Sequence, residues 1–184
     1  MKPWIPKWLW GVVLVAGLCC AAGGTAFAHT MPEGEATLIL PKPPRGQWEI
    51  VPHKTTLGHL DAFGEQFLEK EEFTGDGMRF ARYSVYHGTF VFLARTGAND
   101  DRPASELPIS GYDVKGLDLH TPSHFLVSAP YEEVTAKYGA ADHALHDTPG
   151  LVTYIYEFAG RPTQLIFDVD EAGIIRAIRY RSEV

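Results

Sequence analysis

The last third of the chain has the clearest alternation of apolar and polar positions. Pro130 opens a short segment in which Tyr131, Val134 and Tyr138 recur at helical spacing, and Gly139 follows them. Proline in the first turn and glycine just after the last turn are typical of helix ends. The pattern therefore predicts a short helix from Pro130 to Tyr138.

Three strand-like runs follow this helix. They cover residues 151–158, 164–169 and 174–181. Turn-forming residues separate them, which is typical of an antiparallel meander. Alternation in the first run places Tyr154 and Tyr156 on one face and Ile155 on the other. Both faces of the expected sheet therefore carry apolar side chains.

The first half of the chain repeats this order more faintly. Its pattern predicts a strand over 48–51, a helix over 57–70 and further strands over 78–86, 89–95 and 107–114. Because helix and strands recur in the same order, the sequence predicts two related modules. Their expected bounds are 47–114 and 115–184, after a proline-rich tether over 29–46.

The expected fold class is α+β. Each of the two tandem modules would pack a short helix on an antiparallel β-meander, and the two sheets would join into one concave surface. Helices would cover one side of this combined sheet, and the other side would stay open.

A motif series in the second half resembles a known family. The series reads Tyr112-x-Val114-x-Gly116-Leu117, Tyr131-x-x-Val134-x-x-Lys137-Tyr138-Gly139, Tyr154-x-Tyr156, Leu165-x-Phe167-x-Val169 and Gly173-x-Ile175-x-x-Ile178. It is similar to modules of the tandem family that includes the β-lactamase inhibitory protein (BLIP), and to the single module of small outer-membrane assembly lipoproteins. The resemblance implies a short helix ending in Tyr-Gly, followed by a sheet meander.

The first residues have the composition of a secretory signal. Lys2 and Lys7 precede an apolar stretch, and Ala26-Phe27-Ala28 forms a small-x-small cleavage site. We expect cleavage before His29 and a periplasmic or extracellular location. The alternative is an uncleaved anchor, but the apolar stretch is shorter than the roughly 20 residues that a membrane span needs.

The charge of the chain restricts the classes of partner that it can bind, and its cysteine content restricts how it can be stabilised. The whole chain has a net charge of −7, and loss of residues 1–28 would remove two lysines, both cysteines and no acidic residue. An acidic chain is a poor match for nucleic acid or anionic membranes, and no membrane span is expected after cleavage. A cysteine-free chain of about 150 residues is long enough to fold on its core alone.

Aromatic residues of the strands are candidates for a binding surface. The expected partner-binding residues are Tyr83, Tyr86, Tyr154, Tyr156, Arg161 and Arg179. Tyrosine and arginine are common interface anchors, and a tyrosine hydroxyl can stay hydrated while its ring makes contact. The alternative is that these aromatic side chains form the core of the sheet.

Histidines give a second possibility. His120 and His124 are four residues apart, and His143 and His146 are three apart next to aspartates. Imidazole and carboxylate are ligands for zinc or copper, so a periplasmic metal-binding protein is the alternative function. No metal site or cofactor is assigned from this spacing alone.

No catalytic motif accompanies these features. The chain has no Gly-x-Ser-x-Gly, no His-Glu-x-x-His and no phosphate-binding glycine loop. The sequence therefore favours an exported, non-enzymatic module that binds a protein partner in the bacterial envelope or exterior. A hydrolase of unrecognised type is the least favoured alternative.

Overall fold

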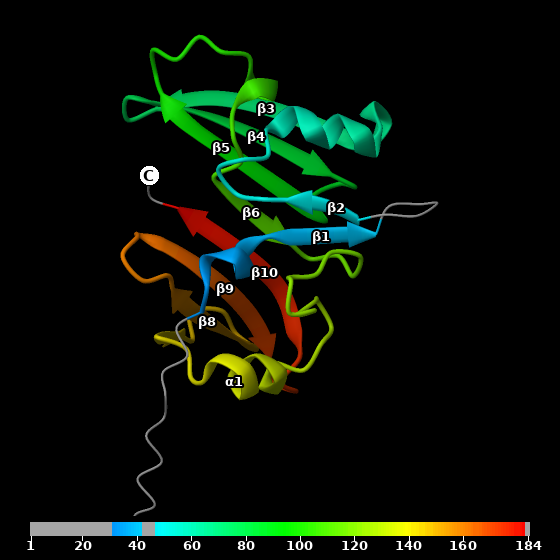
Figure 1. The fold of residues 1–184 in the computed structure, drawn as a ribbon, viewed down its shortest axis with the longest axis vertical. Coiled ribbons are helices and arrows are strands. Elements are labelled where there is room, and N and C mark those ends of the chain that lie inside the picture. The colour runs from blue at the N-terminus through cyan, green and yellow to red at the C-terminus, as the bar shows by residue number, and fades with distance from the viewer. Residues whose placement is uncertain (1–30, 42–46, 183–184) are drawn as a thin grey trace, which may run out of the picture.

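Eight strands form one antiparallel sheet in the computed structural model, which describes residues 31–41 and 47–182 (Figure 1). The strand order is β3-β4-β5-β6-β10-β9-β8-β7. The strands are β3 (Leu68–Gly75), β4 (Met78–Val85), β5 (Phe90–Gly97), β6 (Gly111–Val114), β7 (His143–Leu145), β8 (Leu151–Glu157), β9 (Thr163–Asp170) and β10 (Ile175–Ser182). Two meanders therefore meet where β6 pairs with β10.

The remaining elements are short. A two-stranded ribbon pairs β1 (Leu38–Pro41) with β2 (Gln47–Ile50). Within the described residues, α1 (Glu132–Tyr138) is the only α-helix. The 3-10 helices are η1 (Glu33–Ala36), η2 (Leu57–Phe63), η3 (Glu65–Phe67) and η4 (Ala104–Glu106).

The α+β fold class predicted from the sequence is wrong. The fold is mostly β, with one eight-stranded sheet in place of two tandem helix-on-meander modules. Residues 57–70 do not form the predicted helix. They form the 3-10 helices η2 and η3 and the start of strand β3. The individual predictions of α1, β8, β9 and β10 are confirmed.

β3 explains part of this error. The run Glu69-Lys70-Glu71-Glu72 is charged on both sides of the strand, so it lacks the alternation that marks a half-buried strand. All four side chains are exposed, and β3 lies at one edge of the sheet. Charged edge strands resist pairing with other chains, so this composition suits the position.

One face of the sheet is a continuous apolar layer, which we call the covered face. Register aligns two rows across the strands: Tyr83, Phe92, Tyr112, Tyr180, Leu165 and Tyr156, and then Val85, Phe90, Val114, Ile178, Phe167 and Tyr154. Apart from the half-buried Tyr154, all are at most 3% exposed. The core therefore runs without interruption through the middle of the sheet.

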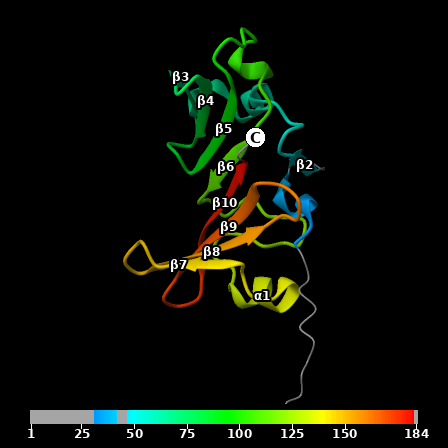
Figure 2. The ribbon, with the colours of Figure 1, turned by 90° about the vertical axis from the view of Figure 1, so that its left-hand side faces the viewer.

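α1, η2 and the β1–β2 ribbon pack on this covered face, and Figure 2 shows β2 and α1 on the same side of the strands. Tyr131, directly before α1, stacks on Tyr154 with ring centroids 4.1 Å apart. The ring of Phe63 in η2 stacks on Phe90 at 6.4 Å. The hydroxyl of Tyr112 donates to the carbonyl of Ala36 at 2.9 Å, which attaches η1 to the centre of the sheet.

The segment predicted as a tether is packed where the structure describes it. Met31, Ala36 and Leu38 belong to the core, and β1 bonds to the chain at His120 through backbone groups of Ile39. The folded region therefore begins before the expected Trp48. Residues 42–46 and the predicted signal segment 1–28, with its cleavage site before His29, lie outside the described residues.

A buried carboxylate fixes this N-terminal segment. Glu35 is 3% exposed and accepts bonds from the Ser123 amide at 3.0 Å, the Ser123 hydroxyl at 2.7 Å and the Tyr138 hydroxyl at 2.8 Å, and from the hydroxyl of Thr121. Burial disfavours its charge, but these bonds outweigh burial and lower the pKa of the Glu35 carboxyl. Glu35 therefore joins η1 to α1 and to the segment before it.

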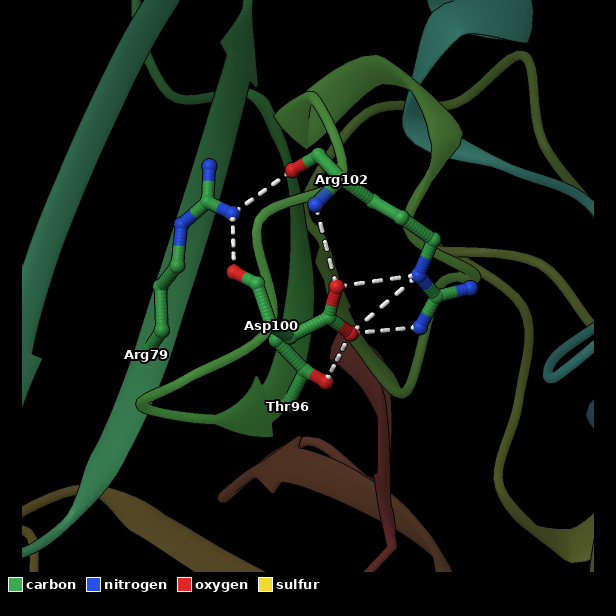
Figure 3. Close-up of polar contacts among 4 residues, drawn as sticks. All are labelled: Arg79, Thr96, Asp100 and Arg102. Atoms are coloured by element: carbon green, nitrogen blue, oxygen red, sulfur yellow. Dashed lines mark hydrogen bonds and ion pairs between the residues drawn. The ribbon is translucent and has the colours of Figure 1, made fainter.

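A second polar cluster closes the loop after β5 (Figure 3). The Asp100 carboxylate accepts bonds from the Thr96 hydroxyl and from the Arg102 amide and guanidinium, while Arg79 donates to the carbonyls of Asp100 and Arg102. The hydrogen bonds from Arg102 are the main reason why the pKa of Asp100 is lowered. Because these bonds join Asp100 and Arg102 of the loop to Arg79 of β4 and Thr96 of β5, the cluster holds the loop against the two strands.

The Glu35 cluster gives a pH-dependent prediction. A carboxyl whose pKa is lowered on folding stabilises the protein above its unfolded pKa, near 4.5, and this stabilisation is lost as the pH falls through the folded pKa. We expect Glu35→Gln to lower the free energy of unfolding at pH 7 by about 2–3 kcal/mol. Urea unfolding should show this difference shrinking below about pH 4.5.

Glu133→Gln is the control, since Glu133 is exposed on α1. A Glu35→Gln protein with unchanged stability, or with the same deficit at every pH, would contradict this account of the buried carboxylate.

Candidate functional site

The predicted tyrosine surface is not formed, because three of its four tyrosines belong to the covered face. Tyr83 and Tyr156 are each 3% exposed, and Tyr154 lies under Tyr131. Tyr86 is the exception at 41% exposed, in the β4–β5 turn with a positive φ of 50°. The core alternative therefore holds for Tyr83, Tyr154 and Tyr156.

Hydrogen bonds explain how these hydroxyls are buried. The hydroxyl of Tyr156 lies 2.9 Å from that of Tyr131 and donates to the carbonyl of Gly139 at 3.0 Å. Burial raises the pKa of both tyrosines, so both remain neutral donors. A tyrosine whose hydroxyl has an internal partner does not need solvent.

The two predicted arginines lie on different sides of the sheet. Arg161, in the turn after β8, pairs with Glu33 at 2.8 Å beside a pocket that Tyr180 also lines. Arg179 of β10 pairs with Asp168 of β9 and lies in register with Ile166 on the opposite face. The structure therefore does not assemble the six predicted residues into one surface.

The opposite face of the sheet, which we call the open face, has its own ordered pattern. Register aligns across its centre Ser84, Val91, Asp113, Arg179, Ile166 and Ile155, which we call the central row. Ser84 and Ile166 are buried, and the other four side chains are half-buried. An ordinary solvated face of an antiparallel sheet is polar, whereas this row places the charged pair Asp113 and Arg179 between apolar residues.

Two polar atoms of the central row are buried without a partner among the described residues. They are Oδ1 of Asp113 and Nε of Arg179, which sit directly opposite each other on β6 and β10. The guanidinium of Arg179 instead turns to Asp168 and Thr153, and Asp113 has Lys115 at 3.7 Å. Arg95 Nε, on the same face, is also unpartnered. Unpaired buried polar atoms are costly to the free energy of folding.

Arg181 lies beside the central row, over a glycine. Its guanidinium donates to the carbonyls of Tyr112 at 2.9 Å and Tyr180 at 3.0 Å. A Cβ at Gly111 would come within 3.1 Å of the Tyr180 carbonyl, which is closer than an ordinary contact, so glycine suits this position. Desolvation, with the neighbouring Arg179, lowers the pKa of Arg181, although it stays a cation.

The four histidines of the metal hypothesis are not brought together. The rings of His120 and His124 stack at 4.7 Å beside β1, on the covered side. His143 is on the edge strand β7, in register with Ile155 on the open face. In the described part of the chain, no group of three or more histidine, cysteine or acidic side chains is arranged to hold a metal ion.

The sequence carried a signal for the open face that the aromatic residues obscured. On β8, β9 and β10, the face that carries Ile155 also carries Thr153, Asp168 and Arg179. The face that carries Tyr154 and Tyr156 has no charged residue on these strands. Charged residues are rarely buried without partners. The set without charges is therefore the core, and tyrosines alone do not indicate exposure.

Comparison with known proteins adds little to this description. No family model matches the chain, and no curated protein matches it. Among solved structures it is similar to a DUF4309 family protein, YjgB, from Bacillus subtilis, at 18% identity over 73% of this chain and 82% of that chain. The TM-score of 0.41 is too low to support a conclusion on fold or function.

None of the helices within residues 31–41 and 47–182 has the length and apolar composition needed to cross a bilayer.

The core position of Tyr156 leads to a stability prediction. Tyr156→Phe should cost about 1–2 kcal/mol, because it removes the bonds to Tyr131 and Gly139. Tyr156→Ala should cost about 3–5 kcal/mol, because it also leaves a cavity. The exposed Tyr86→Ala is the control and should cost less than about 1.5 kcal/mol. Equal melting temperatures for Tyr156→Ala and Tyr86→Ala would contradict the assignment.

Proposed function

We propose that this chain is an exported, non-enzymatic protein-binding module that binds its partner through the open face of the sheet. The observation that carries the proposal is the central row, in which half-buried apolar side chains flank the half-buried pair Asp113 and Arg179. A docked partner would cover the half-buried apolar side chains.

The charges of this face indicate the chemistry of the partner. Arg181 is held by backbone carbonyls, and Arg179 lies half-buried two residues before it on the same face of β10. Arginine forks bind carboxylates in a bidentate manner and are frequent interface anchors. The proposed partner is therefore a protein segment that presents an aspartate or glutamate between apolar side chains. The apolar side chains would contact Val91 and Ile155 on either side of the arginines.

Two parts of the proposal rest on the sequence. Export rests on the signal-like composition of residues 1–28, and the non-enzymatic character rests on the lack of catalytic motifs. Residues Tyr83, Tyr154 and Tyr156 have no place in the proposed interface, since they support the sheet from the covered face.

Site-specific crosslinking tests the proposed face. A photoreactive amino acid at Leu93, next to Gly111 and Arg181 on the open face, should give one discrete adduct in the native host. The same probe at Glu132, exposed on α1, should give none of this adduct. The crosslinked segment of the partner, identified by mass spectrometry, should contain an aspartate or glutamate.

A matched pair of variants tests the role of the arginine. Arg181→Met keeps the aliphatic stem over Gly111 and removes the charge, and should lower the yield of the Leu93 adduct at least tenfold. Arg176→Met, on the same strand but exposed and paired with Asp170, should leave it unchanged. No Leu93 adduct, the same adduct from both probe positions, or equal loss in both variants would refute the proposal.

A further inference from the structure

A pocket of about 360 Å³ opens on the other side of the molecule, away from the open face. Three segments form it: residues 33–37 around η1, residues 51–54 after β2, and the turn after β8 that carries Arg161. Tyr180, which is fully buried on the covered face, lines it as well. This pocket plays no part in the function proposed above.

The turn that carries His53 is fixed by its own hydrogen bonds. His53 has a φ of 62°, which a residue with a side chain adopts only at an energetic cost. Its amide donates to the Ile109 carbonyl at 2.8 Å. Two amides, those of Lys54 and Thr55, donate to the Val51 carbonyl at 3.1 and 2.9 Å, and the Thr55 hydroxyl accepts from the Val51 amide. The backbone at His53 is therefore held in place before any ligand binds.

Polar groups converge on the pocket from these segments. The imidazole Nε2 of His53 lies 3.2 Å from the Tyr180 hydroxyl, and Arg161 contacts Glu33 at 2.8 Å. Lys54 completes the ionisable lining. Partial desolvation lowers the pKa of His53; Glu33 opposes this shift and Arg161 adds to it. The imidazole is consequently neutral near pH 7, where it offers a hydrogen-bonding nitrogen.

The charges and size of the pocket restrict its ligand. Arg161 and Lys54 exceed Glu33 by one positive charge, which matches a single carboxylate better than a doubly charged phosphate. A guanidinium has five donors, so Arg161 can bind a ligand carboxylate while it contacts Glu33. The neutral imidazole and the Glu33 carboxylate suit hydroxyl groups. A pocket of this volume is at the low end for small-molecule sites.

We infer that this pocket binds a small hydroxylated carboxylic acid of about the size of one sugar ring. The carboxylate lies between Arg161 and Lys54, and the hydroxyls bond to His53 and Glu33. This chemistry occurs both in a free sugar acid and at the end of an acidic polysaccharide.

Binding measurements on the purified protein test this inference. By isothermal titration calorimetry, galacturonate should bind with a Kd of about 1 mM or tighter. Galactose lacks the carboxylate and acetate lacks the hydroxyls, so neither should saturate the protein in the same range. Digalacturonate that binds as tightly would assign the site to the end of a polymer, and its exclusion would assign it to the free acid.

Variants locate the binding. Arg161→Gln and Lys54→Gln, both at exposed positions, should weaken galacturonate binding at least tenfold and leave thermal melts unchanged. Arg176→Gln removes an exposed arginine from β10, and this variant should bind as the unchanged protein does. Failure of galacturonate to saturate, equal binding of acetate, or equal loss in Arg176→Gln would overturn the inference. None of these results depends on the open face, so the two proposals fail independently.

Discussion

The pairing of β6 with β10 is the constraint on which the rest of the structure depends. Only four register pairs join these strands, yet they connect β3–β5 on one side to β7–β9 on the other. On the covered face the same junction stacks Tyr112 on Tyr180 at 5.6 Å, and both rings are fully buried. Aromatic burial of this size contributes strongly to stability, so a short ladder is sufficient where its side chains are large.

How far the sequence predicts this fold depends on the strength of local patterns. The helix ending in Tyr138-Gly139 and the three following strands have unambiguous local signals, and all four elements are present. Local patterns do not show which face of the sheet is buried, because Tyr154 and Ile155 lie on opposite faces and both are apolar enough for a core. Charged residues such as Arg179 and Asp168 decide it, since they mark the face that the core does not use.

Other features had no local signal. Glu35 lies in a polar segment whose composition is typical of a solvent-exposed loop. The groups that donate hydrogen bonds to its buried carboxylate follow 86 to 103 residues later in the sequence. A buried charge is stable only when such donors surround it, and their convergence is a property of the tertiary fold. The same holds for the pocket, where Arg161 meets Glu33 across 128 residues of sequence. The sequence predicted Arg161 at the rim of a tyrosine surface, whereas the structure places it beside this pocket.

Alternation along β10 places two chemically different candidate sites on opposite faces of one strand. Arg179 and Arg181 face the open side, whereas Tyr180 between them forms part of the pocket and contacts His53. A strand cannot rotate one residue without moving its neighbours, so the register of β10 fixes both sites at once. That register is held by β6 and β9 on its two sides and by the bulge near Ile175. The strand at the junction of the two meanders is therefore also the element that positions each candidate site.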